Sequence, residues 1–220
     1  MQTKSPGIVL NYIRYRETSI LVSIYTRSSG IKSFIENGVR SSKGKHKMAL
    51  FQPMNLLDLE MFIKNKGLCR ISEAKCYYPF KEIPYTIYKS SIALFLTEVL
   101  YKVLKEEEEN IPLFEYLEGQ IKDLDQAKAG IENFHIHFLW DLMIYLGIFP
   151  GTVKEMFAQL GNRSNELEQI MHQLVELKQV DHLNRTIRNE IVSALLDFYH
   201  LHLESLGEIK SLSVLHEVLA

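Results

Sequence analysis

The stretch Ser19–Asn37, SILVSIYTRSSGIKSFIEN, decides the fold of the first part of this 220-residue chain. Its opening segment, Ser19–Thr26, is rich in the β-branched and aromatic residues that favour strands. Arg27–Gly30 follows with small polar residues and a glycine, which accept the dihedral angles of a turn. Ile31–Asn37 then alternates apolar and polar residues, as a half-buried strand does. The stretch therefore predicts a β-hairpin.

Three further strand-like segments lie on either side of this hairpin: Ile8–Ile13 before it, and Leu56–Ile63 and Leu68–Ala74 after it. Gly38–Lys47 contains glycine, serine and basic residues with almost nothing to bury, and this composition predicts a loop. Antiparallel strands this short must hide their edges. Five of them predict a small closed or partly closed β-barrel over residues 1–80.

The hydrophobic period changes after the short linker Pro79–Pro84, and the rest of the chain reads as helical. The predicted helices are Ile87–Glu107, Pro112–Gln126, Gly130–Leu146, about Glu155–Gln159, Glu166–Lys178, Leu183–Leu203 and Ser211–Leu219. Gly130–Leu146 is apolar on nearly all sides, so we expect it to be the central helix. The predicted fold class is α+β, with a barrel domain (1–80) followed by an all-helical domain (81–220).

Charge is divided between these two parts. Residues 1–80 carry 13 Lys and Arg and 5 Asp and Glu, a net charge of 13 − 5 = +8. The other 140 residues carry 12 basic and 22 acidic groups, a net charge of 12 − 22 = −10, so the overall −2 conceals the asymmetry. Such a division indicates contact with a polyanion, usually nucleic acid; the alternative is an incidental surface imbalance.

Basic residues of the first part are the candidate DNA-binding set, because Lys and Arg bind phosphates with release of counterions. They are Arg14, Arg16, Arg27, Lys32, Arg40, Lys43, Lys45 and Lys47. The alternative for the basic loop is a solvated, mobile segment. Interleaved aromatic residues could stack on bases, although each is also a candidate for the core. These are Tyr12, Tyr15, Tyr25, Phe34 and Phe51.

Catalytic and metal-binding patterns are weak. His135 and His137 are two apart on a predicted helix and point to different faces, so we expect core or interface histidines rather than metal ligands. We interpret Glu106–Glu109 as an exposed helix end. The sequence contains no phosphate-binding glycine motif and no nucleophile elbow. We therefore predict no enzyme, no cofactor and no metal.

Two cysteines, Cys69 and Cys76, allow at most one disulfide, and we expect reduced thiols in a cytoplasmic protein. No apolar run approaches the length of a membrane span, and no secretory signal is visible at the start of the sequence.

Seven short motifs, taken in order, resemble the RecO family of bacterial DNA repair proteins over nearly the whole chain. In the first half they are Gly7–Leu10, Tyr15–Val22 with Tyr25, Thr26 and Gly30, Gly38–Arg40, and Phe51–Met54 with Leu57–Leu59. In the second half they are Leu139, Leu142, Leu146, Gly147 and Pro150, then Arg188 with Phe198, Tyr199 and Leu201–Leu203, and then Lys210–Leu212 with Val214 and Leu215.

The resemblance implies an N-terminal OB-fold, a helical C-terminal domain and no reaction chemistry. It implies a cytoplasmic, nucleoid-associated protein that binds single- and double-stranded DNA and anneals complementary strands. With RecR, such a protein helps to load RecA onto DNA coated by single-stranded-DNA-binding protein. The helical domain is implied to receive the acidic, apolar-ended C-terminal tail of the latter protein. Candidate basic residues for that contact are Lys102, Lys105, Arg163, Arg185 and Arg188.

This chain departs from the family in one respect. Many members hold a structural zinc through four cysteines after the Leu-Gly-x-x-Pro segment, but residues 151–188 contain no cysteine. A zinc site is therefore not expected, and this segment is either shortened or held by packing alone.

A rival hypothesis comes from another functional class. The chain could be a helical protein-interaction module whose basic barrel binds an acidic protein partner rather than DNA. The two hypotheses differ in whether an oligonucleotide or an acidic peptide binds with strong dependence on salt.

Overall fold

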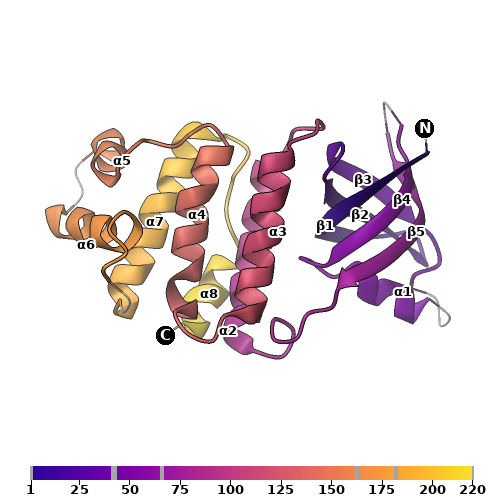
Figure 1. The fold of residues 1–220 in the computed structure, drawn as a ribbon, viewed down its shortest axis with the longest axis horizontal. Coiled ribbons are helices and arrows are strands. Elements are labelled where there is room, and N and C mark those ends of the chain that lie inside the picture. Colours follow the sequence, from indigo (N-terminus) through magenta and orange to yellow (C-terminus); the bar gives the residue numbers. More distant parts are fainter. Residues whose placement is uncertain (1, 41–43, 65–66, 162–163, 181–182, 220) are drawn as a thin grey trace.

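The computed structural model describes residues 2–40, 44–64, 67–161, 164–180 and 183–219. A β-barrel lies at one end of the molecule and a helical region occupies the rest, with α2 (Ile87–Val103) and α3 (Ile111–Gln126) nearest the barrel (Figure 1). The predicted α+β fold class, a barrel followed by helices, is confirmed.

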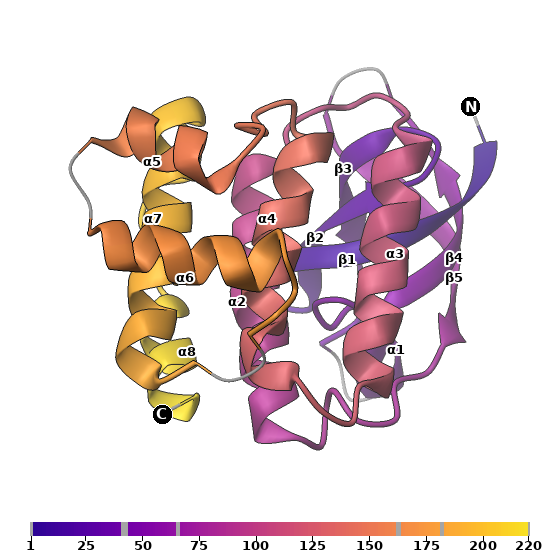
Figure 2. The ribbon, with the colours of Figure 1, turned by 60° about the vertical axis from the view of Figure 1, so that its left-hand side comes forward.

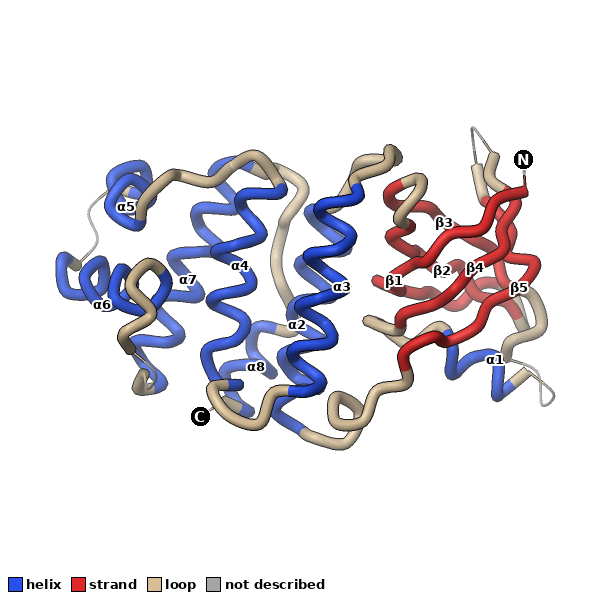
Figure 3. Tube along the Cα trace, in the orientation of Figure 1, coloured by secondary structure: helices blue, strands red, loops and turns tan. Residues whose placement is uncertain are grey.

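Five strands close the barrel in the order β1-β2-β3-β5-β4, the connectivity of an OB-fold (Figure 3). The strands are β1 (Gln2–Tyr15), β2 (Ser19–Thr26), β3 (Gly30–Glu36), β4 (Leu56–Phe62) and β5 (Cys69–Tyr78). All pairings are antiparallel except the short parallel contact between β3 and β5. A register shift between Val9 and Asn11 lets β1 bend and pair with both β2 and β4.

The barrel has its own apolar interior, made by the residues that alternate inward along each strand. Val22, Ile24 and Phe34 are fully buried there. Phe51, which follows the short helix α1 (Lys45–Leu50), is fully buried in the same cluster. The predicted loop over 38–47 is thus wrong at its end, because Lys45–Lys47 already belong to α1.

The helical region contains the predicted helices with shifted ends. In addition to α2 and α3 these are a 3-10 turn (Ile131–Asn133), α4 (Phe134–Tyr145), α5 (Val153–Leu160), α6 (Asn165–Val175), α7 (Arg185–His202) and α8 (Leu212–Val218). Side-chain oxygens of Asn110, Thr152, Ser164 and Asn184 accept backbone N–H groups at the starts of α3, α5, α6 and α7. The prediction that the third helix is central is confirmed, because α4 packs against α2, α3, α6 and α7 (Figure 2).

The described part of residues 151–188, the segment without cysteines, packs on the rest of the helical region. Val153 and Met156 of α5, and Leu167 and Met171 of α6, are buried in the large apolar cluster of the helical region. Among the described residues, no group of three or more His, Cys, Asp and Glu side chains could hold a metal ion. Within the same residues, no helix has the length and apolar character needed to cross a membrane.

The sequence predicts that the acidic run Glu106–Glu109 is an exposed helix end. This prediction is wrong, because the run is not part of a helix. α2 ends at Val103, and the run forms part of the connection to α3. Consecutive carboxylates repel one another and oppose the negative end of a helix dipole, which disfavours continuing α2 through them. The connection instead contacts the barrel, where the carbonyl of Glu106 accepts the N–H of Ile31 at 3.0 Å.

Barrel and helices share one continuous apolar cluster. Ile8, Tyr25 and Leu56 of the barrel belong to the same cluster as the buried residues of the helical region. The ring of Tyr25 stacks on Phe114 of α3 with centroids 6.3 Å apart. The barrel is therefore fixed against α2 and α3 by a packed interface.

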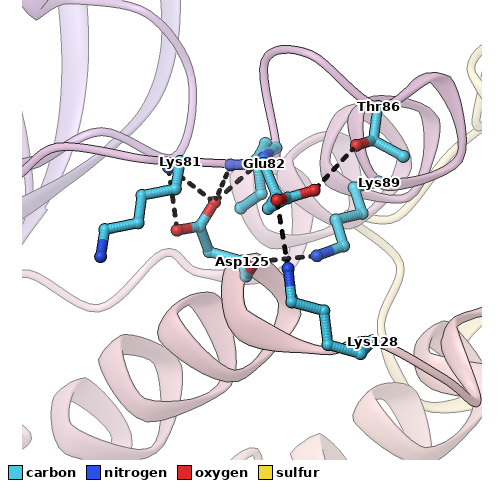
Figure 4. Close-up of polar contacts among 7 residues, drawn as sticks. Lys81, Glu82, Thr86, Lys89, Asp125 and Lys128 are labelled. Atoms are coloured by element: carbon cyan, nitrogen blue, oxygen red, sulfur yellow. Dashed lines mark hydrogen bonds and ion pairs between the residues drawn. The ribbon is translucent and has the colours of Figure 1, made fainter.

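A buried polar cluster anchors the linker between the two parts (Figure 4). Asp125, near the end of α3, is 1% exposed, and its carboxylate accepts the backbone N–H groups of Lys81, Glu82 and Ile83 at 2.9–3.2 Å. The buried ammonium of Lys89 donates to the backbone carbonyl of Asp125 at 2.7 Å. Burial acts to raise the pKa of Asp125, but the three N–H donors and the Lys89 charge outweigh it, so the pKa is lowered.

Candidate nucleic-acid interface

Three of the predicted DNA-binding arginines lie at one end of the barrel. Arg14 is the next-to-last residue of β1, Arg16 lies in the β1–β2 turn, and Arg40 follows β3; all three are exposed. The N–H of Arg40 donates to the carbonyl of Thr18 at 3.0 Å, and its guanidinium donates to the carbonyl of Arg16 at 3.2 Å. These bonds join the β1–β2 turn to the segment after β3, which brings Arg16 and Arg40 together beside the end of β1.

Lys47 lies at the same end, on α1. Its ammonium forms an ion pair with Glu36 of β3 at 2.5 Å, and the Glu36 side chain is only 3% exposed. Burial raises the pKa of Glu36, and the bonds from Lys47 and from the backbone of Ile71 only partly offset that rise. Lys47 therefore balances a buried acid while 45% of its own side chain remains exposed. We call Arg14, Arg16, Arg40 and Lys47 the basic end of the barrel.

Arg27 and Lys32 lie elsewhere, at the β2–β3 turn that faces the helical region. Arg27 pairs with Glu115 of α3 at 2.9 Å, and Lys32 pairs with Glu107 at 2.6 Å. Sequence reasoning placed them on one surface with the other basic residues, but strand β2 separates the two groups. Lys43 lies outside the described residues, and Lys45 is described only as the first residue of α1.

Most of the candidate stacking aromatics belong to the core. Phe34 and Phe51 are fully buried, and Tyr25 is buried under Phe114. Tyr12 is half-buried against the barrel interior. Tyr15 is half-buried beside the basic end, where the guanidinium of Arg16 lies 5.2 Å from its ring centroid.

A basic cleft between the barrel and α2 was missed by sequence reasoning. It measures about 620 Å³ and is lined by Ser23 and Ser33 of β2 and β3, Lys64 of the β4–β5 connection, and Tyr101 and Lys105 from the end of α2 and just beyond it. In OB-folds, nucleic acids bind the face of strands 2 and 3 and the β4–β5 loop, so Lys64 was the available signal.

A second pocket lies in the helical region, where the starts of α2 and α7 meet the C-terminal residues. It measures about 340 Å³ and is lined by Tyr88, Leu183, Arg185, Arg188 and Leu219, among others. The guanidinium of Arg188 is buried and donates to the carbonyls of Leu183 and Leu219 at 2.8 Å each. Arg185 is exposed, so it is the arginine of this pocket that can meet an external anion.

The paired histidines have no joint site. His135 is fully buried, as expected of a core histidine, and its Nδ1 has no hydrogen-bond partner. Burial, and next the positive charge of Arg188, lower the pKa of His135 to about 3, so the ring is neutral at pH 7. His137 is half-buried, and burial likewise lowers its pKa.

Comparison with known proteins agrees with this arrangement. The family model described as "Recombination protein O N terminal" matches residues 1–80, and the one described as "Recombination protein O C terminal" matches residues 84–156. Proteins named "DNA repair protein RecO" are similar over 99% of both chains: the one from Phocaeicola vulgatus is 37% identical, that from Bacteroides fragilis 38%, and that from Flavobacterium johnsoniae 35%. This chain therefore belongs to the RecO family of DNA repair proteins, which are non-enzymatic recombination mediators.

Proposed function

We propose that this protein binds single- and double-stranded DNA through the basic end of its barrel and anneals complementary strands. We further propose that it acts with RecR to load RecA onto DNA coated by single-stranded-DNA-binding protein, in the bacterial cytoplasm at the nucleoid. The observation that carries the proposal is the position of Arg14, Arg16 and Arg40, which are exposed together at one end of the barrel in a RecO family member.

Charge neutralisation supplies the physical mechanism. Guanidinium and ammonium groups attract phosphates and release their counterions without reading the base sequence. When one basic surface holds two strands, their mutual repulsion falls, which favours pairing. Lys47 belongs to this surface, and Lys43 and Lys45 are proposed from the sequence to contribute to DNA binding as well. Arg27 and Lys32 lie apart from this surface, and they contact DNA only if phosphates replace their present partners, Glu115 and Glu107.

Strand annealing provides the test. Two complementary labelled oligonucleotides are mixed with wild type, with R14Q/R16Q/R40Q, and with the control K4Q/K75Q. The control removes two exposed charges, from the start of β1 and from β5, which line a pocket beside Asp58–Glu60 of β4. We expect the triple variant to lose most of the acceleration of annealing and the control to keep it. Equal annealing by the wild type and the triple variant would overturn the assignment of the basic end.

The helical region is proposed to receive the acidic, apolar-ended tail of single-stranded-DNA-binding protein. The pocket beside Arg185 combines apolar walls, Leu183 and Leu219, with an exposed guanidinium, which is the chemistry such a tail requires. Tyr85 and Ile87, at the start of α2, extend the exposed apolar surface beside Tyr88. An R185E variant should bind a tail peptide at least tenfold more weakly than K154E, a charge reversal on α5. Equal binding by the two variants would place the tail elsewhere.

The division into a DNA-binding part (1–80) and a partner-binding part (81–220) belongs to the same proposal. The helical region has an excess of acidic over basic residues, which disfavours contact with DNA and suits it to binding proteins. If the barrel instead binds an acidic protein, annealing will be absent, and an acidic peptide will bind with a steep dependence on salt.

A further inference from the structure

A groove follows the seam between the barrel and α2, and it carries basic residues from both parts. The cleft beside Lys64 and Lys105 forms one half. A second cleft of about 520 Å³, lined by Asn11 of β1 and by Lys102 and Lys210, forms the other. Tyr101 lines both clefts. We call these two clefts together the seam groove.

The charge of the seam groove opposes that of the helical region around it. Residues 81–220 carry 12 basic and 22 acidic groups. Yet the residues that this region contributes to the groove include three lysines, Lys102, Lys105 and Lys210, and only two acids, Glu98 and Glu107. The barrel adds Lys32 and Lys64 and no acid. The groove is thus a basic channel beside an acidic body.

Glu98 has a structural role, which reduces its effect on a ligand. Its carboxylate accepts the N–H groups of Lys210 and Ser211 and the hydroxyl of Ser211, at 2.6–3.0 Å. It also pairs with Lys102 at 3.2 Å. By contrast, Lys64 and Lys105 are exposed, and within the described part of the chain neither forms an ion pair.

Tyr101 supplies a flat apolar surface in the middle of these charges. The ring is half-buried, and the ammonium of Lys105 lies 5.6 Å from its centroid. Aromatic rings between lysines are the usual means of holding unpaired bases and the phosphates that join them. A base must be unpaired to stack in this way, so the arrangement selects a single strand over a duplex.

We propose that a segment of single-stranded DNA lies in the seam groove, with Lys64 and Lys105 on its phosphates and Tyr101 stacked on a base. This site is separate from the basic end, and the proposal rests on the DNA-binding function proposed above. Two sites would let the protein hold one strand in the groove while the basic end holds the other.

Glu107 limits access to this site. Its carboxylate neutralises Lys32 inside the groove, and among the residues that the structure describes Glu107 is the only acid that lines the cleft beside Lys64. A strand that enters must replace this carboxylate with a phosphate on Lys32. Removing the Glu107 charge should therefore tighten single-strand binding, whereas removing the lysines should weaken it.

The test measures fluorescence anisotropy of a labelled single strand and of a duplex of equal length, at several salt concentrations. K64Q/K105Q should weaken single-strand binding and reduce its salt slope by about 1.4, roughly 0.7 for each lost contact. Y101L should weaken it by about five- to a hundredfold without changing the slope, because stacking involves no counterion. Duplex binding should change by less than twofold in each variant.

Matched controls distinguish the loss of contacts at this site from the general effect of changing the protein's net charge. K154Q/K178Q removes two exposed charges from α5 and the segment after α6, at the end of the molecule away from the barrel (Figure 1), and should bind like wild type. E107Q should bind a single strand at least threefold more tightly, and E109Q, an exposed neighbour outside the groove, should not.

Each contrary outcome has a distinct meaning. Wild-type affinity in K64Q/K105Q and Y101L, with loss of binding in R14Q/R16Q/R40Q, would overturn the seam groove and leave the proposed function intact. Equal losses for single strand and duplex would overturn the single-strand assignment. No binding of DNA by the wild-type protein at any salt concentration would overturn the proposed function itself.

Discussion

Replacing Asp125 with asparagine should destabilise the protein by about 2–4 kcal/mol. The carboxylate accepts three consecutive N–H groups, from Lys81, Glu82 and Ile83, in a buried site. Hydrogen bonds to a charged group contribute about 1.5–3 kcal/mol each and neutral ones about 0.5–1.5. An amide retains one oxygen, so each bond weakens by about 1 kcal/mol, and the buried ammonium of Lys89 loses its neighbouring negative charge.

Urea unfolding followed by the fluorescence of Trp140 provides the assay, because Trp140 is the only tryptophan and is buried in α4. The matched control is D123N, an exposed aspartate two residues earlier on α3. D123N should stay within about 0.5 kcal/mol of wild type. A D125N value in the same range would refute the view that this cluster anchors the linker.

The acid dependence of stability gives a second readout of the same cluster. The pKa of Asp125 is lower in the folded protein than its ordinary value. Its contribution is therefore fully present above the ordinary pKa of about 4 and is lost as pH falls toward the folded value. D125N should lack this loss, so its stability should fall less steeply than that of wild type below about pH 5.

Three other substitutions have defined outcomes. G30A should lower the free energy of unfolding by at least about 2 kcal/mol, measured in urea. The reason is that Gly30 has φ +61° and an added Cβ would lie 2.2 Å from the carbonyl oxygen of Glu106. An unchanged free energy of unfolding would contradict this close approach. E98Q should cost about 2 kcal/mol at pH 7 and nothing below the folded pKa of about 2. Burial acts to raise that pKa, but the hydrogen bonds from Ser211, Lys210 and Lys102 together outweigh it; equal costs at both pH values would contradict this. H135L should unfold at a urea concentration equal to or higher than that of wild type. The wild-type ring stays neutral in the folded protein down to about pH 3, whereas the unfolded chain takes up a proton below about pH 6.5, so wild type loses stability over that range and H135L should not. A destabilised H135L would indicate a partner for His135.

The barrel strands were predictable because their signals are local. Alternation in Ile31–Asn37 and the turn at Gly30 determine both the hairpin and its pairing. Helix α1 was missed because only six residues form it, and its stability depends on packing Met48 and Leu50 against a barrel that the local sequence does not reveal.

The residue types of the candidate site could be predicted from the composition, but their arrangement in space could be seen only in the folded structure. Arg16 and Arg27 flank opposite ends of β2, so a hairpin alone already separates them by the length of a strand. The partners of Arg27 and Lys32, Glu115 and Glu107, lie on the far side of the linker. No local pattern connects positions so distant in sequence, which is also why the groove at Tyr101 was not predicted.

The most direct test of the account is the salt dependence of single-strand binding by wild type and R14Q/R16Q/R40Q, measured by fluorescence anisotropy. Each phosphate contact on a single strand contributes about 0.7 to the slope of log affinity against log salt. The account predicts that wild type binds with a steep slope and that the triple variant binds more weakly, with a slope smaller by about 2. Identical slopes and affinities for the two proteins would contradict the claim that the basic end of the barrel holds DNA.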